Sequence, residues 1–222
     1  MTGAFPVCTH DHIAIPAYDP TMKSVSGRKT LPTIPAENAT TISNLLAAFE
    51  GESNANAKYI AFAVKADADG WHGAASLFRA AAQAEQIHAA NHARVIRQLG
   101  GEASCEIEPV DVKTTLENLK TALAGEQFEI DSMYPDFIKE ANEHENTAAI
   151  RTFRWAMEAE KTHARLYTQA IALVEAGKED AWVGTPSDFY VCAACGYTSE
   201  SPEEHERCPV CNLSWDKFEV FR

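Results

Sequence analysis

The sequence predicts a mainly α-helical protein, in which a four-helix bundle is followed by a small metal-binding domain. Four stretches of nearly 30 residues space their apolar side chains as helices do. Within them the phrase Phe-Arg-x-Ala-x-x-Ala-Glu-x-x-His-Ala occurs twice, at 78–89 and 153–164. Two Cys-x-x-Cys pairs follow near the end. We expect an extended arm, a bundle, a linker and a cysteine domain over residues 1–36, 37–178, 179–187 and 188–222 respectively.

Composition narrows the range of partners. The chain has 222 residues, 45% of them hydrophobic, and a formal net charge of −13. Nucleic acids and anionic membranes need a positive surface, so this charge disfavours both, while small neutral substrates remain open. No apolar run approaches the roughly 20 residues of a membrane span, and the N-terminus lacks the pattern of a signal peptide. We therefore expect a soluble protein of the cytoplasm.

The N-terminal arm carries no readable function. Its prolines predict an extended, loop-like course. Cys8, His10 and His12 lie close enough together to suggest a metal site. Short Cys/His runs in such arms are more often solvated, so we expect no metal there.

The first helical hairpin is predicted from about Thr41 to Leu99. Thr41 suits the N-cap of a helix that runs to Asp69 and is broken by Gly70. The second helix runs from about Trp71 to Leu99 and stops at Gly100-Gly101. The first helix takes its apolar spacing from Leu45, Leu46, Phe49, Ile60 and Val64.

The second hairpin follows a crossover from Gly101 to Asp111. Its first helix opens on the capping-box pattern Thr114-x-x-Glu117 and runs to about Ala141, with a kink expected at Pro135. The last helix spans about Glu145 to Ala176 and stops at Gly177. Helices of this length extend about 40 Å, so four of them predict a four-helix bundle with one long crossover.

The two hairpins are copies of one another. Gly51-Glu52 matches Gly125-Glu126, and Leu45 matches Leu119, at an offset of 74 residues. The repeated phrase is offset by 75. A single residue inserted in the second copy accounts for the difference.

Each copy supplies one lone glutamate and one Glu-x-x-His pair. A Glu and a His three positions apart lie about 300° around a helix, so both project from one face. A glutamate from each of two helices, with Glu-x-x-His from the other two, is the ligand set of di-iron and di-manganese carboxylate bundles. Because the pattern occurs twice in register, surface charge is a poor explanation. The predicted ligands are Glu52, Glu85, His88, Glu126, Glu160 and His163.

Glu129 breaks the symmetry, since Ala55 occupies the equivalent position in the first copy. It follows Glu126 by three residues and so shares its face, which makes it the seventh predicted metal ligand of the bundle. Five buried carboxylates need counter-charge, and two divalent cations leave a net charge of only minus one. Oxygen-rich ligation with two imidazoles favours iron or manganese over zinc, and iron most of all.

Two tyrosines are candidates for supporting the ligands. Tyr59 follows Glu52 by seven residues and Tyr134 follows Glu126 by eight, so their hydroxyls could donate to ligand carboxylates. The alternative is that both are packing aromatics. We leave His92 out of the ligand set, because Tyr167 takes the matching position. His72, His144 and His205 have no partner pattern and are expected on the surface.

Cys192, Cys195, Cys208 and Cys211 form two ligand loops. Two Cys-x-x-Cys turns bring four thiolates around one ion, and Gly196 and Asn212 suit the left-handed backbone of such turns. Tetrahedral sulfur does not separate iron from zinc. The surrounding aromatics fit either a redox site or a small structural core.

With both sites in view, the chain resembles rubrerythrin over roughly residues 37 to 222. The motifs that carry the resemblance are Gly51-Glu52-Ser53, Glu85-x-x-His88, Gly125-Glu126-x-x-Glu129-x-x-x-Met133-Tyr134-Pro135, Glu160-x-x-His163 and the region from Cys192 to Phe218. The resemblance implies a ferritin-like di-iron bundle with a C-terminal rubredoxin-like domain. It also implies iron at the cysteines, an iron that moves between His88 and Glu129, and a dimer in which one subunit's tail lies beside the other's bundle. The long arm and Asn212, where Gly is common, depart from the family.

The resemblance leads to a functional hypothesis, a peroxide reductase for oxidative-stress defence. Hydrogen peroxide would be reduced to water at the di-iron centre, with electrons relayed through the cysteine-bound iron from a reductase or rubredoxin, as in an NADH peroxidase. Glu129, His88, Tyr59 and Tyr134 are its candidate catalytic residues. One alternative is a ferroxidase or iron-handling protein with a structural zinc-ribbon tail. Another is an iron-responsive binding module without enzymatic activity.

Overall fold

Five helices, one of them short, build the bundle in the computed structural model. The structure describes residues 38–177, 187–201 and 206–222. The predicted arm, nearly all of the predicted linker and His205 lie outside these residues, and so do Cys8, His10 and His12. The helices are α1 (Ala39–Ala68), α2 (His72–Gln98), α3 (Thr115–Phe128), α4 (Tyr134–Glu143) and α5 (Thr147–Glu175).

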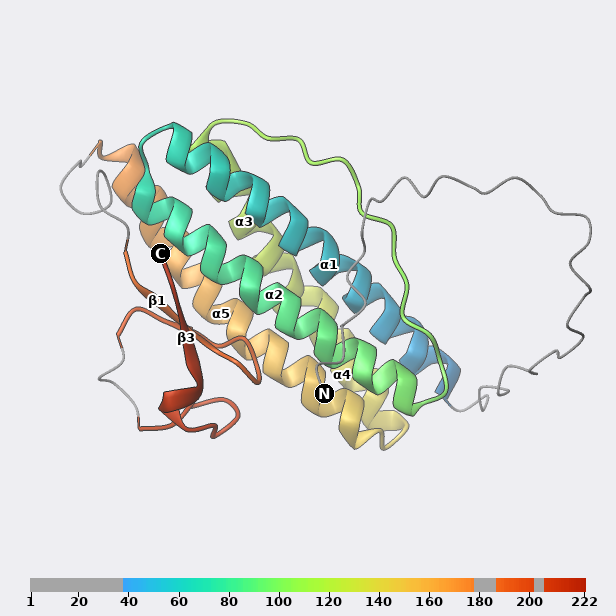
Figure 1. Ribbon diagram of the computed structural model, residues 1–222. Coiled ribbons are helices and arrows are strands. Elements are labelled where there is room, and N and C mark those ends of the chain that lie inside the picture. Colours follow the sequence, from blue (N-terminus) through green and yellow to red (C-terminus); the bar gives the residue numbers. More distant parts are fainter. Residues whose placement is uncertain (1–37, 178–186, 202–205) are drawn as a thin grey trace, which may run out of the picture.

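The arrangement confirms the predicted mainly α fold. Helix α1 packs along α2, and α3 and α4 pack along α5, so each predicted hairpin forms one half of the bundle (Figure 1). The crossover from Gly101 runs beside α1 to the start of α3 (Figure 1). Asn54 of α1 holds it there, accepting from the Glu108 backbone N–H at 2.8 Å and donating to the Glu106 carbonyl at 3.0 Å.

The helix starts follow the sequence in one case and not in another. Thr114 and Glu117 form the predicted capping box, each side chain bonding to the other's backbone N–H. The prediction of Thr41 as N-cap is wrong, because Asn38 precedes the helix. Thr41 is instead buried and donates to the carboxylate of Glu140 at 3.2 Å, an interaction that joins α1 to α4.

The third predicted helix is not continuous. A π-helical segment, Glu129–Met133, separates α3 from α4, and Pro135 lies in the first turn of α4. Proline has no N–H to donate to the preceding turn, which disfavours regular α-helix just before it. The irregularity expected at Pro135 therefore falls in the five residues ahead of it. A π segment accommodates one extra residue in a helix, and it lies where the repeat analysis places the insertion.

The buried core has two parts, and the carboxylate side chains lie between them. Phe62, Phe78 and Tyr167 belong to one part, and Leu45 and Phe153 to the other. The apolar spacing of α1 overstated its buried face. Ile60 and Val64 are 53% and 68% exposed. Among the described residues, no helix is long and apolar enough to span a bilayer.

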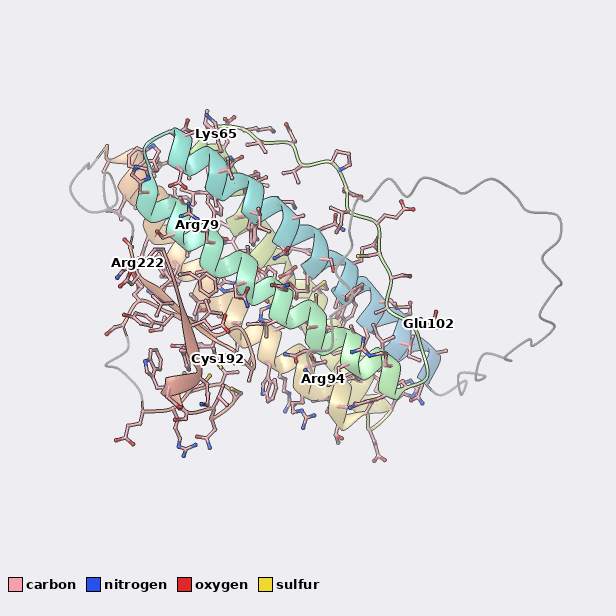
Figure 2. All side chains as sticks on the ribbon, viewed as in Figure 1. Lys65, Arg79, Arg94, Glu102, Cys192 and Arg222 are labelled. Carbon is pink, nitrogen blue, oxygen red and sulfur yellow. The ribbon has the colours of Figure 1, made fainter. Side chains whose placement is uncertain are left out.

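The C-terminal domain is a small antiparallel sheet of β1 (Phe189–Cys192), β2 (Thr198–Ser199) and β3 (Phe218–Phe221), in the order β2-β1-β3. It lies against α2 and α5 (Figure 1). Figure 2 shows Arg222 and Arg79 on facing parts of the two domains, and the Arg79 guanidinium donates to the Arg222 carbonyl at 2.9 Å. Arg165 and Glu200 form a second contact at 2.9 Å.

Candidate metal centre

Six of the seven predicted ligands converge in the middle of the bundle. Helix α1 supplies Glu52, and α3 supplies Glu126. Helices α2 and α5 each supply one Glu-x-x-His pair, from the two copies of the repeated phrase. Each of the six side chains is at most 1% exposed. The helical periodicity of the sequence thus places charged groups where a soluble bundle otherwise buries apolar ones.

The six side chains form two overlapping groups. Glu52, Glu85, His88 and Glu160 bring ligand atoms within 4.8 Å of one another, and so do Glu85, Glu126, Glu160 and His163. Glu85 and Glu160 belong to both groups. The geometry therefore provides two adjacent positions, each with one imidazole and two shared carboxylates. Each position also has one carboxylate that the other lacks, Glu52 in the first and Glu126 in the second, and we call these the private carboxylates.

Unsatisfied polar atoms test whether cations fit these positions. Glu52 Oε2, Glu85 Oε1, Glu126 Oε2 and both carboxylate oxygens of Glu160 are buried without a hydrogen-bond partner among the described residues. Burying an ionised carboxylate without a hydrogen bond or a counter-charge costs several kcal/mol. The same atoms lie in the two groups above. Two divalent cations fit the donor set, because carboxylates and imidazoles are the ligands of iron and manganese.

Charge interactions among the ligands show how much counter-charge the site needs. Burial and repulsion from Glu160 raise the pKa of Glu126 to about 7. Burial and the same neighbour hold the pKa of Glu85 well above its usual range. Although burial disfavours charge on an imidazole, the neighbouring carboxylates of Glu126 and Glu160 raise the pKa of His163 to about 9. The carboxylates therefore favour positive charge beside them.

Glu129 lies in the π segment, half-buried and outside both groups. Burial and repulsion from Glu52 and Glu126 hold its pKa well above the usual range, while His88 acts in the opposite direction. The carboxyl group therefore senses the charges of the site without belonging to either ligand group.

The two tyrosines donate across the bundle. Tyr59 of α1 donates to Glu126 Oε1 of α3 at 2.7 Å. Tyr134, at the start of α4, donates to Glu52 Oε1 of α1. Each hydroxyl thus supports the private carboxylate of the opposite half and leaves that carboxylate's other oxygen free of hydrogen bonds.

Sequence reasoning missed the buried environment of His92. This imidazole is fully buried and outside both ligand groups, 3.8 Å from Glu52 Oε1. Its Nε2 lies 3.2 Å from the Tyr134 hydroxyl and its Nδ1 lies 3.1 Å from Thr152 Oγ1. The one signal in the sequence was its spacing, one turn beyond His88. By contrast, His144 is exposed as expected, and His72 is half-buried beside Asp67.

The C-terminal domain contacts both ligand imidazoles. Nε2 of His88 lies 3.0 Å from the Cys195 carbonyl, and Nε2 of His163 lies 3.0 Å from Thr198 Oγ1. The carbonyl can only accept, so Nε2 of His88 donates a hydrogen bond to the C-terminal domain and Nδ1 faces the carboxylates. Nδ1 lies 2.9 Å from both Glu85 and Glu160.

Close approach explains Gly196, which follows Cys195. A Cβ atom at this position would lie 2.3 Å from Nε2 of His88, and its φ is +77°. Asn212, in the second loop, adopts φ 63°. The predicted left-handed backbone of both loops is confirmed. The departure at Asn212 leaves the loop intact, because asparagine tolerates this conformation.

The four cysteines gather their sulfur atoms within 4.8 Å of one another. Cys192 and Cys211 Sγ lie 3.5 Å apart, as do Cys195 and Cys208 Sγ, too far for disulfides and right for a shared ion. Hydrogen bonds from Cys192 and Cys195 lower the pKa of Cys208 to about 2, while hydrogen bonds with Cys192 and Cys208 raise the pKa of Cys195. The cluster therefore favours one thiolate, and a cation would be needed to keep the other thiols deprotonated.

A four-helix bundle with a two-cation carboxylate site, joined to a four-thiolate site, defines a non-haem di-iron protein with a rubredoxin-like domain. Comparison with known proteins agrees. Residues 43–171 match the family model described as Rubrerythrin, and 190–219 match the rubrerythrin rubredoxin-like domain. The chain belongs to the rubrerythrin family, and it carries the di-iron site and the four-cysteine site of that family.

Individual relatives cover nearly the whole chain. It is 36% identical to Rubrerythrin-2 of Clostridium acetobutylicum, over 83% of this chain and 98% of the relative. It is 33% identical to nigerythrin of Nitratidesulfovibrio vulgaris, over 91% and 96% respectively. A structure of mixed-valence nigerythrin aligns over 94% of this chain and 100% of that one, with 32% identity and a TM-score of 0.72. A Desulfovibrio desulfuricans bacterioferritin aligns over 68% and 90%, with 25% identity and a TM-score of 0.61.

Proposed function

We propose that this protein reduces hydrogen peroxide to water in the cytoplasm, taking electrons through its rubredoxin-like domain. The reaction consumes one peroxide, two electrons and two protons and yields two waters. The observation that carries the proposal is the contact between the Cys195 carbonyl and the His88 imidazole, at 3.0 Å. It connects one cysteine loop directly to a ligand of the bundle site. A ferroxidase has no need of such a contact.

Iron in both sites would supply the electron transfer. The neighbouring side chains orient the residues that would hold this iron. His88 and His163 hold their Nε2 protons on acceptors of the tail, so their Nδ1 atoms face the carboxylates. Tyr59 and Tyr134 hold one oxygen each of Glu126 and Glu52. Fixed ligands of this kind are the usual contribution of a protein to a metal site.

We propose that Glu129 adds a fifth carboxylate when the site carries more positive charge. It lies within electrostatic reach of Glu52, Glu126 and Glu160. Because it stands outside both ligand groups, its approach would change the charge balance without displacing a shared carboxylate. His88, which draws the Glu129 carboxylate toward its charged form, is the natural residue for it to replace.

An electron-donating reductase or a rubredoxin is the proposed partner, and the assembly is proposed to be a homodimer. Four contacts that dock the tail join its residues to α2 and α5. A tail exchanged between two subunits could therefore make the same contacts.

The test compares two metal-loaded forms of the full chain, both with iron in the bundle. One form carries iron at the four cysteines and the other zinc, verified by metal analysis and by visible absorption, since the iron–sulfur site is coloured. Peroxide-driven NADH oxidation is measured with a reductase supplied. We expect turnover with iron and none with zinc. Equal turnover of the two forms would refute the electron route through the cysteine site. Iron mineralised in place of peroxide turnover would favour the ferroxidase alternative, which the bacterioferritin likeness supports.

A further inference from the structure

The duplicated bundle supports its two private carboxylates unequally. Glu52 and Glu126 each accept a hydrogen bond from a tyrosine of the opposite half. Beyond that tyrosine the halves differ. We propose that His92 and Thr152 form a hydrogen-bonded chain that locks the Tyr134 hydroxyl onto Glu52, so that His92 is a positioning residue for one of the two metal positions. This proposal rests on the proposed function for its effect on turnover, but not for its effect on metal binding.

The direction of these hydrogen bonds follows from the last of them, between Tyr134 and Glu52. If Tyr134 donates to Glu52 Oε1, its hydroxyl oxygen can accept from Nε2–H of His92, 3.2 Å away. Nδ1 of the neutral ring is then an acceptor, and the Thr152 hydroxyl donates a hydrogen bond to it at 3.1 Å. Three hydrogen bonds thus point one way, from Thr152 to Glu52, and each donor has one acceptor.

Burial makes this direction firm. His92 is fully buried, Tyr134 is fully buried and Thr152 is 5% exposed. The rings of Tyr134 and Phe153 lie 6.1 and 5.5 Å from the His92 ring, which fixes its position. In such surroundings an unpaired ring nitrogen is costly, so the Thr152 hydroxyl selects the tautomer in which Nε2 donates.

The equivalent positions around Glu126 lack this hydrogen-bonded chain. Tyr167 takes the place of His92, and its buried hydroxyl makes no hydrogen bond to any described residue. Leu77 takes the place of Thr152 at the offset of 75 residues and is fully buried. Tyr59, which serves Glu126, packs edge-on against Tyr167, with 5.7 Å between the ring centroids, so its neighbour is a second tyrosine and not a hydrogen-bonded imidazole. The repeat itself provides the comparison, because both metal positions have the carboxylate and the tyrosine but only that of Glu52 has the imidazole and the threonine.

The consequence concerns the oxygen that remains. With Oε1 of Glu52 occupied by Tyr134, Oε2 is left without a hydrogen bond and belongs to the first ligand group, with His88. If the lock were lost, Tyr134 could donate to His92 instead, and the Glu52 carboxylate would be free to rotate. The first metal position should then bind more weakly, while the position of Glu126 and His163 should not change.

The test is an anaerobic titration of the full chain with Fe²⁺ against a chromophoric chelator, which resolves the two bundle equivalents. We expect Thr152→Val to weaken one equivalent by about 5-fold, the loss of one net hydrogen bond. Thr152→Ser, which keeps the hydroxyl, should restore it. His92→Phe should weaken the same equivalent by about 10- to 100-fold. Tyr167→Phe is the matched control and should change neither.

Three outcomes would overturn the proposal: no change in Thr152→Val and His92→Phe, an equal loss at both equivalents, or an equal loss in Tyr167→Phe. Thermal unfolding without metal identifies any variant that fails to fold, and the remaining variants then decide. Peroxide turnover is measured separately. If the unaltered protein shows no peroxide activity, the proposed function is rejected. Loss of metal affinity in the variants would then still support the positioning role of His92.

Discussion

Replacing Gly196 by alanine should uncouple the rubredoxin-like domain from the bundle. The residue has φ +77°, and an added Cβ would lie 2.3 Å from Nε2 of His88 and 3.2 Å from Cβ of Ala84. Neither neighbour can yield, since His88 is held among buried carboxylates and Ala84 belongs to a packed helix. The cysteine loop must retreat instead.

The size of the effect follows from these distances. Ordinary van der Waals contact begins at 3.4 Å, so the loop must withdraw by about 1 Å. The left-handed backbone adds about 1–2 kcal/mol of strain, and loss of the bond between Cys195 and His88 adds about 1 kcal/mol. Withdrawal by about 1 Å also breaks the hydrogen-bonded path from Cys195 to His88, so we expect a several-fold slower electron transfer from the tail to the bundle.

Rapid mixing of the fully reduced protein with peroxide, followed through the visible absorption of the cysteine-bound iron, measures this transfer. The matched control is Gly70→Ala, because Gly70 has φ +85° but nothing within 4 Å of its added Cβ. It introduces the same backbone strain without the collision and should reoxidise like the unaltered protein. Reoxidation of Gly196→Ala at the unaltered rate would show that electrons do not pass through this contact.

Four further predictions concern the bundle. Tyr134→Phe and Tyr59→Phe should each lower peroxide turnover by about 10-fold or more, measured at saturating peroxide, because each leaves a buried carboxylate without its donor. Glu129→Ala should slow turnover while metal analysis still finds the four-cysteine site filled. A chelator that removes the metal ions from the bundle should lower the melting temperature. The free energy of unfolding should fall by about 2.7 kcal/mol for each site, if the free metal concentration had been 100 times the dissociation constant of that site. Hydrogen bonding from Lys65 and Thr115 lowers the pKa of Asp69. The ionised Asp69 therefore stabilises the fold above its unfolded pKa of about 3.9, and this stabilisation is lost as pH falls through the lower folded pKa. In Asp69→Asn the melting temperature should fall less between pH 6 and pH 3 than in the unaltered protein.

The convergence of the six candidate ligands in the bundle was predictable because helical periodicity fixes which side chains share a face. Glu85 and His88, three residues apart, had to project together, and the repeat required a second pair opposite. The lone glutamates were identified only because Gly51-Glu52 recurs as Gly125-Glu126. Repetition thus supplied the evidence that a single motif could not.

Features that depend on packing between elements were not predictable. The apolar spacing of α1 indicated that Ile60 and Val64 would be buried, but periodicity does not say how wide the covered stripe of a helix is. The crosswise pairing of each tyrosine with the opposite glutamate depends on the distance between helices. Likewise, the contact of the tail with His88 depends on docking that leaves no local pattern other than Gly196.

The inserted residue links the sequence to the asymmetry of the site. Tyr59 follows Glu52 by seven residues, about 700° in an α-helix, which returns it close to the same face. Tyr134 follows Glu126 by eight residues, and a regular α-helix would rotate it by a further 100° or so. The π segment at Glu129–Met133 absorbs the extra residue and restores the hydroxyl to Glu52. The same segment carries Glu129, which has no counterpart in the first copy. One inserted residue in the second half therefore accompanies two features of the site, the alignment of Tyr134 with Glu52 and the additional carboxyl group of Glu129.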